Sequence, residues 1–553
     1  MTKKFVWIIF LGIILLAIVL RFWQLGKVPI SPDWDEVALG YNAYSILQTG
    51  RDEYGKLFPI VLRSFDDYKP ALYAYLTIPS IIFFGLTTFA VRIQSAIAGV
   101  IAVIALFFLA RELFKKDSIA LLSSFFLAIS PWHIQFSRIA FESNVGLCLN
   151  ILAVLSFIKG LKKPWLLSVS AFFAGISIYV YQSEKVFLPI LFLAMTLLYR
   201  KELLDLPKKY LLTAIVFGLL IVSPMVFYTI TNKEALTRAQ GVSIFSESTQ
   251  VLKENSIKLL EDQKNNDILG LILDNRRVVF AKLITSGYLS HFNLNWLFIS
   301  GDIARHHAPN MGLLYLFELP FLFLGIYYLF FGPPAGGFEK KTKLFVFLWI
   351  LIAPIPASIT TGVPHAVRTL NIVPMVSILT AMGLFYSLQK LSNIPAKGWS
   401  ASGSRYLILS FISLLFIFNF YYYLNQYFVQ QNYFYAKEWQ YGYEKAIAEI
   451  KKIENKYDRI IVSNQPPMDQ SYMFFLFYLR YLPLEYQKES TYSSGGFREN
   501  HRYGKYEFRP IDWSKEIRDG KTLFVGRPVD FPNATSLFEE SYPNGEKAML
   551  LVE

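Results

Sequence analysis

The chain has 553 residues, of which 54% are hydrophobic and only 17% are charged. Soluble domains average about 25% charged residues, so this composition excludes an ordinary soluble protein, and it also excludes collagen-like, coiled-coil and disordered chains. The net charge of +13 could indicate nucleic-acid binding in a soluble protein, but in a membrane protein such an excess usually lies in the cytoplasmic loops. We therefore expect no nucleic-acid partner. The single cysteine, Cys148, excludes an intramolecular disulfide and a cysteine-cluster metal site.

The first predicted element is an apolar run from Phe5 to Leu20, preceded by two lysines. A basic start before an apolar run is also typical of a secretory signal peptide. Here no small-residue cleavage site follows, because the run ends in Arg21-Phe22-Trp23-Gln24. We therefore predict an uncleaved first span with its N-terminus in the cytoplasm.

Further apolar stretches of about the length of a membrane-spanning helix follow along the chain. Together with the first they predict about eleven spans, the later ones at 93–110, 118–132, 144–158, 165–180, 186–199, 211–229, 312–331, 344–359, 370–388 and 405–424. Every loop expected inside is basic, as the positive-inside rule requires. The pattern predicts a multi-pass membrane protein with everything after Tyr423 outside the cytoplasm, and the compact loops favour a bacterial or archaeal plasma membrane.

Three regions on the outer side are too long to be simple connectors: 24–89, 231–310 and 425–553. In the last, Glu444–Lys456 has the pattern of an amphipathic helix and Arg459–Ser463 that of a short buried strand. We predict an α-helical transmembrane domain at 1–424, whose outer loops 24–89 and 231–310 form the active-site face. A small extracytoplasmic α/β domain at 425–553 follows. Linkers are expected at Gly332–Gly337 and Pro395–Ser404.

The first outer loop carries adjacent carboxylates, Asp35 and Glu36, and later Tyr68-Lys69-Pro70. Each has a purely structural interpretation: Asp35 could cap a helix that starts near Val37, and Lys69 could extend toward the membrane surface. The recurrence of acids and a lysine in one loop, among aromatic residues, favours a functional role.

The later outer loops add further charged residues. Arg138 and Glu142 lie four residues apart and would pair on one helix, yet ionisable groups near membrane depth are functional candidates by default. His365 and Arg368 flank a helix start, a combination that suits a phosphate, although an arginine there can also be an interfacial anchor.

Arg305, His306 and His307 precede the span at 312–331. Adjacent histidines diverge by about 100° on a helix and alternate on a strand, so they rarely share one metal ion. Cations and carboxylates around an apolar bundle suit a substrate with a phosphate head and a lipid tail. A carboxylate would then accept the proton of an incoming hydroxyl.

The ordered set of Asp35-Glu36, Lys69-Pro70, Arg92 and Arg138 resembles the GT-C-type glycosyltransferases of the protein O-mannosyltransferase and aminoarabinose-transferase superfamily. The resemblance is strongest over residues 30–145. It implies a GT-C fold and inverting transfer of a sugar from a polyprenyl-phosphate donor to an acceptor glycan, lipid or protein outside the cytoplasm.

The resemblance also implies roles for individual residues. Asp35 would be the catalytic base, with Glu36 as its partner. Donor binding would fall to the remaining candidates, which are Tyr68, Lys69, Arg138, Glu142, His365 and Arg368. No cofactor is certain, but Asp35 and Glu142 are candidate ligands for a divalent metal ion, since hard cations prefer oxygen ligands.

Two other functions remain open at this point. A flippase for lipid-linked sugars would show charges deep within spans and two related halves, and a polysaccharide polymerase or ligase would lack the acidic pair after the first span. Aminoarabinose transferases have Glu-Lys-Pro-Pro where this chain has Tyr68-Lys69-Pro70-Ala71, so the sugar stays open. No glycine-rich phosphate loop is present in the sequence, which disfavours a nucleotide-sugar donor.

Overall fold

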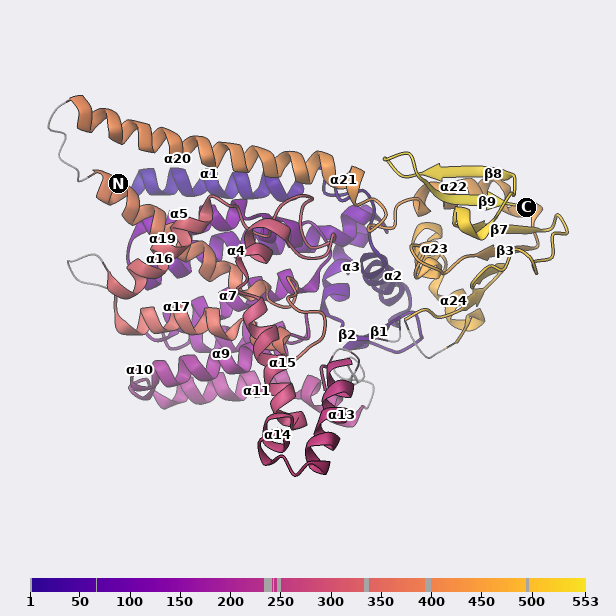
Figure 1. Cartoon of the computed structure of the whole chain (residues 1–553). Helices are drawn as coiled ribbons and strands as arrows, with labels where there is room; N and C mark the ends of the chain where they lie inside the picture. Colours follow the sequence, from indigo (N-terminus) through magenta and orange to yellow (C-terminus); the bar gives the residue numbers. More distant parts are fainter. Residues whose placement is uncertain are drawn as a thin grey trace.

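A bundle of helices and a C-terminal sheet domain make up the computed structural model, with the N-terminus and the sheet domain at opposite ends of the molecule (Figure 1). The structure describes residues 2–65, 67–232, 241, 243–245, 250–332, 338–392, 399–493 and 497–553. Of the expected linkers, residues 333–337 and 395–398 lie outside the described part of the chain. Residues 399–404 were also expected to be linker, but they form the first turns of helix α20 (Trp399–Asn425).

Seven helices in the described part of the chain are long and apolar enough to cross a membrane. They are α1 (Lys3–Phe22), α4 (Thr88–Phe114), α7 (Glu142–Gly160), α11 (Lys208–Thr231), α17 (Lys340–Ile352) continued by α18 (Ile355–Ser358), α19 (Val373–Ser392) and α20 (Trp399–Asn425). A chain with several such helices is a multi-pass membrane protein. Each coincides with a predicted span.

The predicted count of eleven spans is not confirmed, because the other four fall on shorter helices. These are α5 (Asp117–Ile129), α8 (Leu166–Ser177), α9 (Glu184–Leu198) and α16 (Glu318–Phe331). Helix α5 bends by 58° into α6 (Pro131–Ser137), and counting this pair as one span gives up to eight. Pro131 occupies the first turn of α6, where a proline is tolerated and begins a new helix.

The predicted outer regions contain several short elements between the spans. The first has α2 (Trp34–Thr49), a hairpin of β1 (Val61–Ser64) and β2 (Asp67–Pro70), and α3 (Leu72–Phe84). The second has α13 (Gln250–Lys264), α14 (Ile268–Leu273) and α15 (Arg276–Ser290). The remaining short helix, α10 (Arg200–Leu204), joins α9 to α11.

Helix α2 begins earlier than the sequence suggested, and Asp33 rather than Asp35 caps it. The Asp33 carboxylate accepts the backbone N–H of Glu36, and the Glu36 side chain accepts the backbone N–H of Asp33. This reciprocal capping box satisfies two backbone donors of the first turn. It leaves the Asp35 side chain available for another partner.

The C-terminal domain is a seven-stranded mixed sheet with helices. Its strand order is β4-β5-β6-β3-β7-β9-β8, and the central β3 (Arg459–Val462) runs parallel to both β6 and β7. The predicted helix and strand are confirmed as α22 (Tyr443–Ile453) and β3. The other elements are α21 (Gln431–Phe434), α23 (Ser471–Leu479), α24 (Pro483–Glu489), β4 (Thr491–Tyr492), β5 (His501–Tyr503), β6 (Tyr506–Phe508), β7 (Thr522–Gly526), β8 (Ser536–Ser541) and β9 (Lys547–Val552).

Helix α2 lies between the bundle and the C-terminal domain and packs on α4, α23 and α24. A Cβ at Gly40, on α2, would lie 2.7 Å from Val91 of the bundle and 2.8 Å from Phe477 of the C-terminal domain. Only a residue without a side chain allows this close approach from both sides. The helix with the predicted catalytic residues is thus enclosed on two sides.

Candidate active site

Asp35 and Lys69 form an ion pair that joins helix α2 to the β1–β2 hairpin. The hairpin places Lys69 opposite Leu62, and Pro70 opposite Val61. The Asp35 and Lys69 side chains remain 24% and 13% exposed, so solvent reaches part of the pair. The structure thus brings together Asp35, the predicted base, and Lys69, the predicted phosphate ligand. Their chemical roles stay predictions.

Glu36 lies one residue away in a different environment. Its carboxylate accepts two hydrogen bonds from the Arg92 guanidinium, both 2.8 Å, and a third from the backbone N–H of Ala140 at 2.9 Å. Glu36 and Arg92 are almost completely buried. A carboxylate with this many fixed donors anchors α2 to α4, and its predicted function as partner of the base is untested.

Asp33 connects the start of α2 to the loop at 301–310. Its carboxylate pairs with Arg305 at 2.8 Å, and the Arg305 guanidinium lies 4.2 Å from the ring centre of Trp34. Burial raises the pKa of the Asp33 carboxyl to about 6, although the charge of Arg305 opposes the rise. Sequence reasoning missed Asp33 as a site residue, since its partner is 272 positions away.

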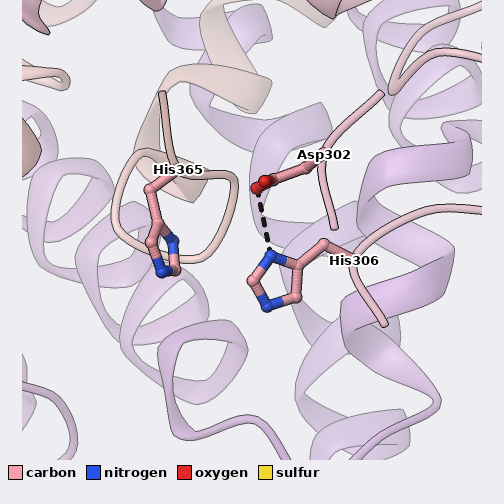
Figure 2. Close-up of side chains that lie close together, drawn as sticks. All are labelled: Asp302, His306 and His365. Atoms are coloured by element: carbon pink, nitrogen blue, oxygen red, sulfur yellow. Dashed lines mark hydrogen bonds and ion pairs between the residues drawn. The ribbon is translucent and has the colours of Figure 1, made fainter. Parts of the chain in front are cut away.

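The loops at 301–310 and 359–369 meet at Asp302, His306 and His365 (Figure 2). Nδ1 of His306 lies 3.0 Å from Oδ2 of Asp302, and the backbone N–H of Ala366 donates to the same oxygen at 2.5 Å. The imidazole rings of His306 and His365 are 5.1 Å apart. Burial raises the pKa of Asp302, but the hydrogen bond and charge of His306 outweigh it and bring the value to about 2.

This cluster contains one of the predicted phosphate ligands, His365. Arg368, in the same loop, donates to Thr360 Oγ1 and at 2.8 Å to the carbonyl of Thr361. The cluster of three potential metal ligands in the described residues does not include Asp35 or Glu142. Metal binding by those two acids, and phosphate binding by His365 and Arg368, stay predictions.

Arg138 and Glu142 do not share a helix, so the alternative in which the two residues simply pair along one helix face does not apply. Helix α6 ends at Ser137, and Glu142 begins α7. The buried Arg138 guanidinium donates to the carbonyls of Leu20, Arg21 and Val28 at 2.9 to 3.1 Å. It thereby satisfies two carbonyls in the last turn of α1 and one in the segment that follows. Donor binding by Arg138 and Glu142 is untested.

Tyr68 joins the hairpin to the segment that leads into helix α9, and α9 forms part of the wall of an apolar cavity within the bundle. Its carbonyl accepts a hydrogen bond from Gln182 at 2.9 Å, just before α9. The cavity, about 610 Å³ in volume, lies among α8, α9 and α11. Most of its lining is apolar, and the polar residues in it are Ser170, Lys185, Thr196 and Thr229. Its walls include Ile178, Pro189, Gly218 and Met225.

A second, more polar cleft of about 430 Å³ lies between the loop at 301–310 and the C-terminal domain. Trp34 and Arg305 form one side, and Gln440, Pro467 and Asp469 form the other. Gln440 also accepts the backbone N–H of Trp34 at 3.1 Å. Trp34 directly precedes Asp35 on helix α2, but neither Asp35 nor Lys69 is among the residues that line the cleft.

A comparison with protein families gives one match. The model of the dolichyl-phosphate-mannose-protein mannosyltransferases matches residues 68–228, a stretch that begins at the Tyr68-Lys69-Pro70 segment. No curated protein sequence matches the chain significantly.

Solved structures extend the likeness to the whole chain. ArnT from Cupriavidus metallidurans in the apo state has a TM-score of 0.54 at 12% identity, covering 100% of this chain and 98% of that chain. The chain has the GT-C glycosyltransferase fold. The fold expected from the sequence resemblance is therefore confirmed.

Two further structures are similar. ArnT from the same organism bound to undecaprenyl phosphate gives a TM-score of 0.53 at 12% identity, with the same coverage. The oligosaccharyltransferase AglB from Archaeoglobus fulgidus, in complex with an inhibitory peptide and a dolichol-phosphate, has a TM-score of 0.49 at 14% identity. That alignment covers 86% of this chain, which spans 63% of the length of AglB.

Proposed function

We propose that the protein is an inverting glycosyltransferase that moves a sugar from a polyprenyl-phosphate donor to an acceptor on the extracytoplasmic side of the membrane. The observation that carries this proposal is the partly exposed ion pair of Asp35 and Lys69, on a GT-C fold. A base and a phosphate-binding cation side by side are the two groups that such a transfer needs.

The donor would bind across the hairpin and the bundle. Lys69 meets the phosphate, and the polyprenyl tail enters the apolar cavity among α8, α9 and α11. Tyr68 supports this path, because the hydrogen bond between Gln182 and its carbonyl joins the strand of Lys69 to the segment that leads into α9. One of the similar structures, ArnT from Cupriavidus metallidurans, holds undecaprenyl phosphate.

The reaction would be a single displacement. An acceptor hydroxyl oxygen attacks the anomeric carbon while its proton passes to the Asp35 carboxylate, and the bond between the anomeric carbon and the phosphate oxygen breaks. Lys69 stabilises the negative charge that grows on the departing lipid phosphate. When the phosphate draws Lys69 toward itself, Asp35 loses its ion-pair partner and becomes a stronger base.

The acceptor would enter through the polar cleft beside Trp34. Its walls come from the bundle and from the C-terminal domain, so the domain contributes to the choice of acceptor. An aromatic face at the entrance suits a sugar or a peptide. The sugar of the donor and the class of acceptor are left to the experiment.

The test is sugar transfer or release by the purified full-length protein from a panel of radiolabelled polyprenyl-phosphate sugars. Asp35→Asn should lower the rate about 10²–10⁴-fold, the range for loss of a general base, and Lys69→Ala should also abolish most turnover. Lys56→Ala is the matched control, since Lys56 lies in the same outer loop but contacts the Tyr228 hydroxyl instead.

The outcomes separate the alternatives. Turnover that persists in Asp35→Asn would remove Asp35 as the base and direct attention to Glu142. If no donor is consumed and labelled lipid instead crosses the bilayer of liposomes containing the protein, the enzyme proposal fails and the flippase takes its place. Elongation of a glycan chain in the presence of donor would identify a polymerase.

A further inference from the structure

Asp302 and His306, from the loop at 301–310, and His365, from the loop at 359–369, lie with their ligand atoms within 4.8 Å of one another (Figure 2). We propose that this cluster is a binding site for a divalent transition-metal ion, and that Zn²⁺ fits it best. Two imidazole nitrogens and one carboxylate oxygen form a common Zn²⁺ ligand set, with a fourth position left for water.

The spacing of the three groups suits one ion. Nitrogen and oxygen ligands lie about 2.0–2.2 Å from Zn²⁺, so two ligands of one ion are at most about 4.4 Å apart. The observed upper limit of 4.8 Å is within reach of small side-chain rotations. His306 is buried, while Asp302 and His365 are partly exposed, which leaves a path for the ion.

His365 supplies an independent observation. Its Nδ1 atom is buried and has no hydrogen-bond partner among the described residues, although its backbone N–H donates to Nε2 of His291 at 3.2 Å. Buried polar atoms are nearly always paired. The backbone of this residue is thus held in place while a ring nitrogen remains without a partner, as expected for a ligand.

The surroundings support a metal ligand set. The Ala366 backbone N–H holds the Asp302 carboxylate, and ligating carboxylates are commonly held by such an additional hydrogen bond. Two positive side chains lie close by, but Arg305 pairs with Asp33 and Arg368 is directed at Thr360 and at the backbone of Thr361.

His307 is a matched control within the same loop. It follows His306 directly, but its Nδ1 lies 2.7 Å from the carbonyl of Ala308, and its ring contacts Tyr435. The two adjacent histidines therefore have separate partners, as the sequence pattern indicated. Replacing His307 should disturb local packing without removing a ligand.

A bound ion would fasten two loops that are distant in sequence. One loop carries Arg305, which pairs with the residue that caps helix α2, and the other carries Arg368. The proposed role is positional: the ion would hold together these two loops, one of which pairs with the cap of helix α2, without taking part in the reaction. This inference concerns metal binding and does not depend on the proposed glycosyl transfer.

The experiment measures the metal content of the purified full-length protein in detergent. Protein stripped with a chelator is loaded with Zn²⁺, passed over a desalting column and analysed by mass spectrometry of the metal. We expect about one equivalent in the wild type and in His307→Asn, and a loss of at least about 10-fold in affinity in Asp302→Asn and His365→Asn, typical of a removed ligand interaction. Loading with Co²⁺ gives a visible absorption band as a second readout.

Retention of Zn²⁺ by His307→Asn together with loss by His365→Asn supports the site. Failure of the wild type to retain Zn²⁺ or Co²⁺ overturns it, and so does equal retention by all variants, which would indicate adventitious binding elsewhere. Size-exclusion elution of each variant shows that the fold persists. A wild type that binds metal but transfers no sugar would leave this site intact and refute only the proposed function.

Discussion

The guanidinium of Arg92 holds both carboxylate oxygens of Glu36 in a pair that is hidden from solvent. One residue earlier, Asp35 remains partly exposed and pairs with a lysine from another element. Two adjacent acids of identical charge therefore have different environments. Glu36 fixes helix α2 in the bundle, and this fixed helix holds Asp35 in position.

Removing one member of the buried pair should be strongly destabilising. Glu36→Gln leaves the Arg92 charge buried without a counter-ion, and such losses cost about 3–5 kcal/mol. We expect a clear fall in the thermal unfolding midpoint in detergent. Asp35→Asn is the control and should unfold close to the wild-type temperature. Equal midpoints for the two variants would contradict the structural role of Glu36.

Two substitutions at Asp33 can separate its role as the cap of helix α2 from its ion pair with Arg305. Asp33→Asn keeps an oxygen for the helix cap but loses the charge that pairs with Arg305, whereas Asp33→Ala loses both. Loss of an N-cap costs about 0.5–2 kcal/mol, so the alanine variant should unfold at the lower temperature. Identical unfolding curves for the two variants would show that the cap contributes little.

At position 69, the type of cation matters as well as its charge. Lys69→Arg keeps a positive charge beside Asp35 but replaces a compact ammonium with a planar, forked group. We expect partial activity in Lys69→Arg and almost none in Lys69→Ala, measured as kcat/KM for the lipid donor. An alanine variant as active as the arginine variant would exclude a phosphate-binding role for Lys69.

The apolar cavity should determine how tightly the donor lipid binds. Ala171 lines it, and Ala171→Trp would fill part of its volume, so KM for a long-chain donor should rise. Phe172→Trp, on the same helix but 41% exposed on the outside, serves as the control and should leave KM unchanged. If both variants bind the donor like the wild type, the tail must lie elsewhere.

Glu53 gives the protein a stability that depends on pH. Burial raises the pKa of its carboxyl well above the ordinary value near 4.5, although the side chain of Asn42 opposes the rise. The folded state then holds a proton that the unfolded chain releases as the pH increases, so stability falls above that ordinary value. Glu53→Gln should raise the unfolding midpoint more at about pH 8 than at about pH 5. A gain that is the same at both pH values would contradict this assignment.

The sequence predicted the positions of the long helices and singled out Asp35 and Lys69 in one loop, but it did not predict the ion pair between them. Apolar runs such as Phe5–Leu20 became helices because a chain in lipid must satisfy its backbone hydrogen bonds internally. Asp35 and Lys69 are close enough in sequence for one loop to join them. Where Ser130 and Pro131 interrupt an apolar run, however, composition could not show that the helix bends.

Contacts between distant loops were beyond sequence reasoning. Asp33 meets Arg305, and His306 faces His365, only because the bundle brings their loops together. The sequence indicated only weakly that Arg305 belongs to the site that includes Asp33, because Arg305 stands beside two histidines just before an apolar stretch. Asp302 had no such signal, since a single acid in a long loop is ordinary.

Gly40 has a mechanical consequence. With Val91 on one side and Phe477 on the other, only the backbone of α2 separates the bundle from the C-terminal domain at Gly40. A side chain at this position would clash with both neighbours and force the bundle and the C-terminal domain apart. A substitution at Gly40 should therefore disturb the contacts of α2 with both neighbours at once, and with them the position of Asp35.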